Sequence, residues 1–213
     1  MSRLDILFDL IGEGEVFADV GCDHGYIAEM VIKSGKYKKV ILSDISKKSL
    51  DKAINLLSPY GDRVEFIVSD GFEGYSTVPD GAIIAGMGGE EIVKILSGDI
   101  LPNSLVLAPQ KNTDKVRKIL LDRGYKILKD FTFYSQNKFY DAISAVKGED
   151  FYSPKEIIFG RDNLKDKPDG FIRKIKFEIG VLEGVLQDEK ASKLSKESAK
   201  IRLIILKDLI KWK

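Results

Sequence analysis

Short apolar runs alternate with amphipathic segments through most of the chain, and this alternation is the feature that most limits its fold. Strands that alternate with helices imply βαβ units and a mainly parallel sheet. After Gly124, two runs of strand character are separated by the polar residues 135–137, which predicts a terminal hairpin at one edge of the sheet. The seven expected strands are Val16–Val20, Val40–Ser43, Val64–Val68, Ala82–Ala85, Leu105–Ala108, Tyr125–Phe133 and Phe139–Val146. The expected helices are Tyr26–Ser34, Lys47–Leu57, Glu90–Leu96 and Thr113–Arg123, after a leading helix over the apolar residues Leu4 to Ile11.

The pattern changes near Asp150, and the segment beyond it is expected to be helical. Apolar residues recur there at spacings of three and four, first from Ile172 to Leu186 and then from Leu194 to Ile210. The break between these stretches, near residues 188–192, indicates an antiparallel helical hairpin. Only residues 157–159 also have strand character. We therefore expect an α/β domain over residues 1–150 and a coiled-coil-like helical hairpin over residues 151–213.

Charge is distributed unevenly between these two parts. Residues 1–150 hold 19 Lys and Arg against 23 Asp and Glu, a balance of −4, whereas residues 151–213 hold 15 against 10, a balance of +5. Lysine and arginine side chains that bind phosphates release counterions, so a basic appendage favours a polyanionic partner. The alternative is an ordinary solvated helix face.

The composition narrows the class of protein. The single cysteine, Cys22, excludes an internal disulfide framework and fits a reducing cytoplasm. The single histidine, His24, excludes a multi-histidine metal site, so we expect no metal. No stretch approaches about 18 consecutive apolar residues, and no basic region precedes an apolar one at the amino terminus, which argues against a membrane span or a secretion signal. We therefore expect a cytoplasmic protein with no membrane partner.

The segment Val16–Ala28 is typical of a buried strand, a tight glycine turn and a helix. Such a unit gathers backbone N–H groups and a helix N-terminus at one point, which suits a cofactor. The turn here is Gly21-Cys22-Asp23-His24-Gly25, whereas a dinucleotide fingerprint has Gly-x-Gly-x-x-Gly so that the backbone can approach a pyrophosphate. The Asp23 carboxylate would repel a pyrophosphate and attract an ammonium group. S-adenosylmethionine carries an ammonium group and no phosphate, so the turn favours this methyl donor, bound by Asp19, Gly21, Asp23 and His24. Cys22 is expected to be a small packing residue.

Two further strands end on an acidic residue. Asp44, followed by Ile45, closes the second strand and is expected to accept hydrogen bonds from ribose hydroxyls. Its alternative role is to cap the next helix, for which Ser46 is the better candidate. Asp70, followed by Gly71, closes the third strand. In methyltransferases the acidic residue at this point usually accepts a hydrogen bond from the adenine amino group. The alternative is a plain Asp-Gly turn. Because both strands end at the same edge of the sheet, cofactor binding is favoured for both.

The segment Ala85-Gly86-Met87-Gly88-Gly89 closes the fourth strand, and its three glycines imply close backbone approach of a ligand. We expect Gly86 and Met87 to contact the cofactor and Gly88 to shape the gap between the methyl group and a target base. The loop lacks the Asn-Pro-Pro-Tyr motif that grips an exocyclic nitrogen, and it is compatible with methylation of an endocyclic one.

Asp23 and His24 are, with Gly88, the candidate catalytic residues. His24 either helps to orient the base or accept a proton, or it is a structural hydrogen-bond partner. Three aromatic residues of the terminal hairpin, Tyr134, Phe139 and Tyr140, could stack on a base, although aromatics at strand spacing are more often part of a core.

Together these motifs resemble the bacterial TrmK family, the tRNA (adenine-N1)-methyltransferases that modify adenine 22. The matching segments are residues 18–26, 69–71, 85–89, 109–112 and 139–141. The resemblance implies a Rossmann-like class I methyltransferase core with a seven-stranded sheet, S-adenosylmethionine as cofactor, tRNA as substrate and a helical extension that helps to hold it. Pro109-Gln110-Lys111-Asn112 closes the fifth strand, where it could border the target base, although it departs from the family's usual Gln-Pro-Asn order.

Two other functions remain open from the sequence. A small-molecule methyltransferase would use the same core, but its specificity insertions are normally longer and its extension need not be basic. A nucleotide-binding or RNA-binding module without catalysis would gain nothing from Asp19, Asp44 and Asp70, which all close strands at one edge. Methyl transfer to unmodified tRNA discriminates between the three.

Overall fold

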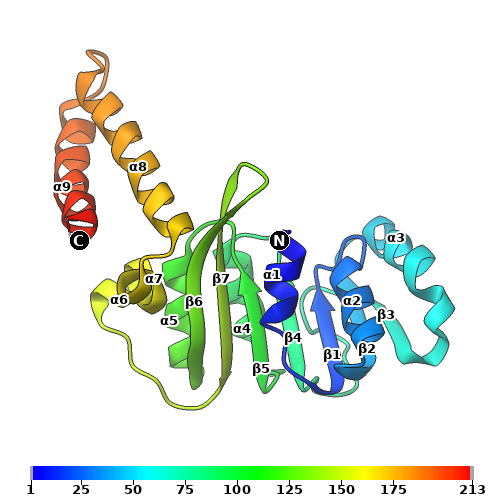
Figure 1. Cartoon of the computed structure of the whole chain (residues 1–213). Coiled ribbons are helices and arrows are strands. Elements are labelled where there is room, and N and C mark those ends of the chain that lie inside the picture. The colour runs from blue at the N-terminus through cyan, green and yellow to red at the C-terminus, as the bar shows by residue number, and fades with distance from the viewer. Residues whose placement is uncertain (1, 212–213) are drawn as a thin grey trace.

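The computed structural model describes residues 2–211, which contain one seven-stranded mixed sheet (Figure 1). The strand order is β3-β2-β1-β4-β5-β7-β6, in which β1 to β5 are parallel and β6 and β7 form the expected antiparallel hairpin. All seven expected strands are confirmed. Their bounds are β1 Gly14–Val20, β2 Tyr37–Asp44, β3 Val64–Val68, β4 Gly81–Ala85, β5 Ser104–Ala108, β6 Tyr125–Ser135 and β7 Lys138–Lys147.

Helices pack on both faces of this sheet. On one face α1 (Arg3–Asp9), α2 (Tyr26–Ser34) and α3 (Lys47–Leu57) form a core with the buried side chains of the strands. On the other face α4 (Gly89–Leu96) and α5 (Thr113–Asp122) form a second core. A short 3-10 helix, η1 (Ser58–Arg63), links α3 to β3. The two layers leave the carboxyl ends of the parallel strands, and the loops that follow them, accessible to a ligand.

Local sequence signals account for several element ends. Ser46 caps α3, because its hydroxyl accepts a hydrogen bond from the Ser49 N–H group at 3.3 Å. In the β6–β7 turn Gln136 and Asn137 have φ angles of 48° and 61°, so both adopt the left-handed backbone conformation. Two-residue turns of this kind match the right-handed twist of the strands they join. The polar residues between the last two strands therefore form a tight hairpin.

The segment after the sheet is helical, with α6 (Pro154–Phe159), α7 (Arg161–Asp166), α8 (Asp169–Gln187) and α9 (Lys193–Ile210). The expected antiparallel hairpin is confirmed: α8 and α9 pack against each other and extend away from the sheet (Figure 1). They share a small apolar core, which includes Ile175, Ile179, Leu203 and Leu206. The division at residue 150 stays a prediction.

Residues 157–159, whose pattern also allowed a strand, belong to α6. Ser153 and Glu156 form a capping box, and Pro154 occupies the first turn, so the local signals favour a helix start. α6 and α7 lie against α5 and β6, and Phe159 and Leu164 also pack into the apolar core of α8 and α9. Within residues 2–211, no helix combines the length and apolar character needed to cross a membrane.

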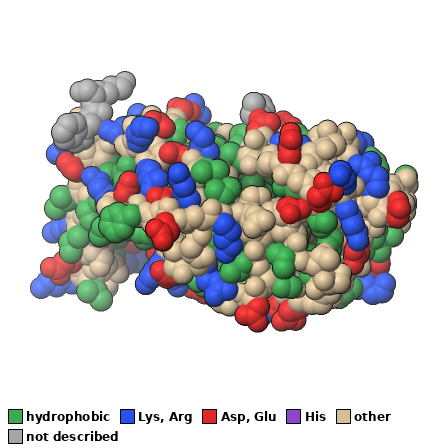
Figure 2. All heavy atoms as spheres, turned by 90° about the horizontal axis from the view of Figure 1, so that it is seen from below, with side chains coloured by type: hydrophobic (Ala, Val, Ile, Leu, Met, Phe, Trp, Pro, Cys, Tyr) green, Lys and Arg blue, Asp and Glu red, His purple; other side chains and the backbone are tan. Residues whose placement is uncertain are grey.

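The side of the molecule opposite the carboxyl ends of the parallel strands shows no dominant charge. Figure 2 views the molecule from below Figure 1, and there the Lys and Arg side chains are interspersed with Asp and Glu side chains. Mixed charge of this kind is typical of an ordinary solvated surface.

Candidate functional site

The loops that follow β1 and β3 are bonded by their backbones to the end of β2, which lies between these two strands. The N–H groups of Gly21 and Cys22 donate to the Ser43 carbonyl at 2.8 and 3.1 Å, and the Ser69 N–H group donates to the Asp44 carbonyl at 3.0 Å. Gly21 has a φ of 72°, a left-handed conformation that glycine adopts without strain. The expected site residues of three separate strands are thereby brought to one edge.

Two cavities open at this edge and share Gly21, Asp23, Ala85 and Gly86 among their walls. The first, which we call the strand-end cavity, has a volume of about 470 Å³. It is lined by Val20, Gly21, Asp23, Asp44, Ile45, Ser69, Asp70, Gly71, Ala85, Gly86, Met87, Glu91 and Ile95. Every charged side chain in this lining is acidic, so the cavity suits a ligand with positive charge and hydrogen-bond donors.

The second cavity, which we call the α1 cavity, has a volume of about 560 Å³ and lies beneath the amino-terminal helix. From the expected site it contains Asp19, Gly21, Asp23, His24 and Gly86. The remaining walls come from α1, α2, β4, β7 and the loops after β1, β5 and β6: Ser2, Arg3, Leu4, Leu7, Cys22, Tyr26, Ile27, Ile83, Ala85, Gln110, Gln136 and Tyr140. Within residues 2–211, no group of three His, Cys, Asp or Glu side chains could hold a metal ion.

Asp23 and His24 form a small polar cluster at the mouth of these cavities. His24 Nδ1 lies 2.7 Å from Asp23 Oδ2, and its ring stacks on Tyr26 with centroids 5.3 Å apart. Lys52 of α3 donates to Asp23 Oδ1 at 2.9 Å. The hydrogen bond from Lys52 and the contact with His24 lower the pKa of the Asp23 carboxyl. Asp23 is therefore a carboxylate that already has cationic and polar partners.

Asp19 differs from Asp23 because it is buried. Its side chain lines the α1 cavity, and Oδ2 accepts a hydrogen bond from the Ala28 N–H group of α2 at 3.3 Å. Burial raises the pKa of Asp19 to about 7, with a smaller contribution from the charge of Asp44. Burial also raises the pKa of the neighbouring Cys22 thiol, so Cys22 is a packing residue rather than a nucleophile.

Asp44 organises the turn as well as lining the strand-end cavity. Oδ1 accepts from the Ser46 N–H group at 2.8 Å, and Oδ2 accepts from the Asp23 N–H group at 3.3 Å. Each carboxylate oxygen has a further lone pair for a ligand. The neighbouring Ile45 is 74% exposed. An apolar side chain this exposed at a cavity wall offers a surface for a flat, apolar group.

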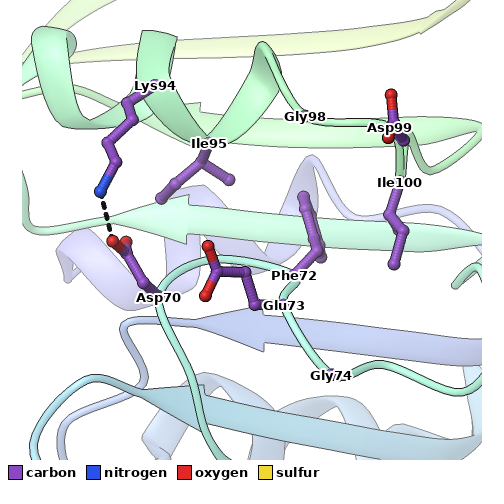
Figure 3. Close-up of a pocket in the computed structure, with 9 residues that line it drawn as sticks. All are labelled: Asp70, Phe72, Glu73, Gly74, Lys94, Ile95, Gly98, Asp99 and Ile100. Atoms are coloured by element: carbon purple, nitrogen blue, oxygen red, sulfur yellow. Dashed lines mark hydrogen bonds and ion pairs between the residues drawn. The ribbon is translucent and has the colours of Figure 1, made fainter.

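Asp70 lies between the strand-end cavity and a third cavity of about 310 Å³, which Figure 3 shows. Lys94 of α4 forms an ion pair with its carboxylate across the mouth of this third cavity (Figure 3). Phe72, Ile95 and Ile100 supply the apolar walls. A ligand donor that reaches Asp70 therefore meets a carboxylate that Lys94 already orients.

The glycine loop after β4 is held by the loop after β5. Gln110 donates from Nε2 to the Gly86 carbonyl at 2.6 Å, and its backbone N–H group donates to the Met87 carbonyl at 3.0 Å. The Gly89 N–H group donates to the Lys111 carbonyl at 2.9 Å. These bonds fix the position of Gly86 and Met87 in the cavity walls.

Gly88 is the one expected site residue that lines neither cavity. A Cβ atom there would meet Glu91 Oε2 at 2.3 Å and Lys111 Cε at 2.9 Å, both at the ends of flexible side chains. Gly88 is the N-cap of α4, and its Cβ position faces those two side chains. The structure therefore does not bring it together with Asp23 and His24.

Several polar residues of the α1 cavity were not among the expected site residues, among them Arg3 and Gln136. No local signal marks these two, because α1 and the β6–β7 turn reach the site only through tertiary packing. Gln110 and Tyr140, which the sequence offered as neighbours of a target base, both line this cavity.

Comparison with known proteins gives consistent relatives. A family model described as a methyltransferase domain matches residues 1–143. A putative tRNA methyltransferase of Mycoplasma genitalium is 32% identical over 162 residues, which cover 70% of this chain and 72% of the relative. The tRNA (adenine(22)-N(1))-methyltransferase of Bacillus subtilis is 26% identical over 156 residues, covering 70% of this chain and 65% of the relative.

A solved structure matches the fold over nearly the whole length. The Streptococcus pneumoniae protein Sp1610, a putative tRNA (m1A22) methyltransferase in complex with S-adenosyl-L-methionine, aligns with a TM-score of 0.87 and 22% identity. The alignment covers 99% of this chain and 100% of that one, so the shared fold includes the carboxy-terminal helices.

Proposed function

The chain belongs to the methyltransferase domain family, and we propose that it transfers the methyl group of S-adenosylmethionine to N1 of adenine 22 in tRNA. The observation that carries the proposal is the pair of joined cavities at the carboxyl ends of β1, β2, β3 and β4, with acidic residues at three of these strand ends. The Bacillus relative supplies the specific base and atom.

The lining of the strand-end cavity fits S-adenosylmethionine better than a dinucleotide. The cofactor carries a sulfonium and an ammonium charge, and the charged side chains in this lining are all carboxylates. Phosphate groups are usually held by cations or by glycine-rich turns that allow the backbone to approach. Here Asp23 stands in that turn, so a pyrophosphate would meet a like charge.

Most of the expected cofactor residues then have a role. Asp44 accepts from the ribose hydroxyls and Asp70 from the adenine amino group, while Ile45 and Met87 provide apolar surface for the adenine ring. We assign the ammonium group to Asp19, because Asp23 already holds Lys52 and His24 whereas Asp19 faces the α1 cavity from a buried position. Gly86, which has open space at its Cβ position, leaves room for the cofactor, whereas a Cβ atom at Gly21 would meet Met87 and one at Gly71 would meet Ile95.

The α1 cavity takes the target base. S-adenosylmethionine supplies an activated methyl group, which adenine N1 attacks in line through its lone pair. The reaction needs alignment more than a strong base, so the task of the chain is to position the ring. Gln110, fixed by its bond to the Gly86 carbonyl, and Tyr140 can hold the ring edge and face, and His24 at the mouth can orient it or accept a proton from N6 after transfer.

The basic extension holds the tRNA. Of its cationic side chains, Lys174 is bonded to Asp141 and Arg202 to Glu178, so these two are partly neutralised. The exposed lysines Lys176, Lys193 and Lys200 are better placed to meet phosphates. This distribution supports a phosphate-binding surface along α8 and α9.

Replacing Asp44 by alanine should weaken S-adenosylmethionine binding about tenfold or more. The substitution leaves ribose hydroxyls without an acceptor, and a lost buried hydrogen bond costs about 1–3 kcal/mol. Calorimetric titration measures the affinity, with Asp51→Ala on the exposed face of α3 as the control. An unchanged affinity in Asp44→Ala would remove the ribose assignment.

The affinity for S-adenosylmethionine should fall as the pH drops below 7. With the pKa of Asp19 at about 7, acid protonates the carboxyl of the free protein, and a positive ligand must displace that proton to bind. Affinity should therefore drop about fivefold from pH 7 to pH 6, where the ligand's own α-amino group stays protonated. Asp19→Asn should bind more weakly at pH 7 and lose this dependence, whereas Asp44→Asn should keep it. The same slope in Asp19→Asn would assign the ammonium contact elsewhere.

The proposed reaction is tested with radiolabelled S-adenosylmethionine and two tRNA transcripts. The unmodified transcript should accept the label, and a transcript with adenine 22 replaced by guanine should not. Label in both transcripts would place the target elsewhere in tRNA. No label in either, with intact cofactor binding, would favour a small-molecule methyltransferase.

A further inference from the structure

Three aromatic side chains form a cluster at the tip of the β6–β7 hairpin, outside the three cavities described above. Tyr134 and Phe139 are cross-strand partners with ring centroids 5.0 Å apart, and Phe177 of α8 lies 6.1 Å from Phe139. Tyr134 is 40% exposed and Phe177 is 65% exposed. Aromatic side chains release much free energy on burial, so a grouped and exposed set indicates a contact surface. We call these three residues the aromatic platform.

The aromatic platform and the α1 cavity lie on opposite sides of the same hairpin. Side chains alternate between the two faces of a strand, so Tyr134 and Phe139 face α8 while their neighbours Phe133 and Tyr140 face the other way. Tyr140, together with Gln136 of the turn, lines the α1 cavity. One pair of strands therefore separates the platform from the cavity that takes the target base.

A cationic side chain lies beside the aromatic platform. The Arg173 guanidinium lies 5.5 Å from the centre of the Tyr134 ring, and it also pairs with Asp169 at 2.8 Å. Lys176, the residue before Phe177 in α8, is exposed. Exposed rings with cations beside them are the means by which proteins hold unpaired nucleotides, because the rings stack on bases and the cations attract phosphates.

We propose that the aromatic platform stacks an unpaired base of the RNA substrate, adjacent in the strand to the base that enters the α1 cavity. The proposal rests on the proposed function. An enzyme that acts on a base must take it out of its stack, and the neighbouring base then loses a stacking partner. The platform replaces that partner on the far side of the hairpin. Arg173 over the Tyr134 ring and the exposed Lys176 favour a nucleic acid over an apolar protein segment, which would gain nothing from these cations.

The test compares substitutions of Phe177, whose exposure allows replacement without loss of the fold. A base stacked on an aromatic side chain adds to the binding free energy, and alanine removes that contribution. Phe177→Ala should therefore weaken tRNA binding by about 5-fold to 100-fold. Phe177→Trp should keep the affinity, and Phe177→Leu, which is apolar but not aromatic, should lose it as alanine does. Ile204→Ala, at a 73% exposed apolar position of α9, is the matched control and should bind as the wild type does.

A spectroscopic measurement separates stacking from a general structural effect. The chain has one tryptophan, Trp212, so Phe177→Trp in a Trp212→Phe background carries a single indole at the platform. Unmodified tRNA should quench its fluorescence, and the affinity for S-adenosylmethionine should be unchanged in every variant.

Wild-type affinity for tRNA in Phe177→Ala, or full affinity in Phe177→Leu, would overturn the platform. If the wild type still methylates tRNA in that case, the proposed function stands and only the platform fails. If the wild type neither binds nor methylates tRNA, both proposals fall together.

Discussion

Replacing Arg117 by alanine is expected to lower the free energy of unfolding by about 3–5 kcal/mol, because it leaves a buried carboxylate unpaired. The Arg117 side chain is 2% exposed and that of Asp130 is 1% exposed. Nε and Nη2 of Arg117 donate to the two Asp130 oxygens at 2.8 and 2.9 Å. Nη1 donates to the Ile157 and Ile158 carbonyls of α6 at 3.0 and 3.3 Å. One side chain thus joins α5, β6 and α6.

Denaturant unfolding of Arg117→Ala and of Arg173→Ala measures this effect. Arg173 forms an exposed ion pair within α8, so its loss should cost less than about 1 kcal/mol. The double variant Arg117→Met with Asp130→Leu should regain most of the stability, since it removes both charges together. Equal losses in the two single variants, or no recovery in the double one, would contradict the assignment.

The same contacts bear on how the two predicted domains meet. Asp130 donates its backbone N–H group to Asp162 at 2.8 Å, and Thr132 donates its own to Asn163 Oδ1 at 2.7 Å. Residues 151–166 therefore complete the packing of β6, and a cut at residue 150 would leave buried polar groups of the sheet without partners. Substitutions on the surface of α8 and α9 are a cleaner probe of tRNA binding than removal of the whole segment.

Most strands and helices of the sheet domain could be predicted, because their local sequence signals agree with their places in the fold. The helices Tyr26–Ser34 and Lys47–Leu57 have the expected bounds, because glycines 25 and 35 limit the first and Ser46 caps the second. Residues 157–159 show the opposite case, since a short apolar run fits either a strand or a buried helix. The capping box formed by Ser153 and Glu156 was the signal that distinguishes them.

For the site, too, residues marked by a local sequence signal could be predicted, and residues brought in by tertiary packing could not. Asp19, Asp44 and Asp70 could be found because strand ends share an edge, and all three line the cavities there. Partners that come from other elements could not. Lys52 of α3 binds Asp23, and Lys94 of α4 binds Asp70, through packing that no pattern along the chain encodes.

The glycines of the loop after β4 look equivalent in the sequence, but the structure separates them. Gly86 is left-handed, with a φ of 83° and open space at its Cβ position. Gly88 meets only the ends of flexible side chains. A Cβ atom at Gly89 would lie 2.5 Å from the Asn112 carbonyl oxygen and 2.6 Å from that of Lys111, both in the backbone. Gly89 is thus the residue that lets the loops after β4 and β5 meet.

Gly89→Ala should therefore reduce methyl transfer to tRNA about 100-fold, because the added methyl group separates the two loops and displaces both Gly86 and Gln110 from the cavity walls. A displacement near 1 Å in a reacting pair costs about that factor, and overpacking should lower the free energy of unfolding by about 1–3 kcal/mol. Single-turnover methylation, measured on variant protein that thermal unfolding shows to be folded, checks the rate.

The matched control is Gly180→Ala in the interior of α8, where a Cβ atom meets nothing within 4 Å. Alanine is the better helix former, so this variant should gain about 0.5–1 kcal/mol of stability and methylate at the wild-type rate. The two substitutions add the same methyl group and differ only in what surrounds it. If Gly89→Ala also methylated at the wild-type rate, the contact between the two loops would have no part in positioning the target base, and Gln110 would lose its assigned role.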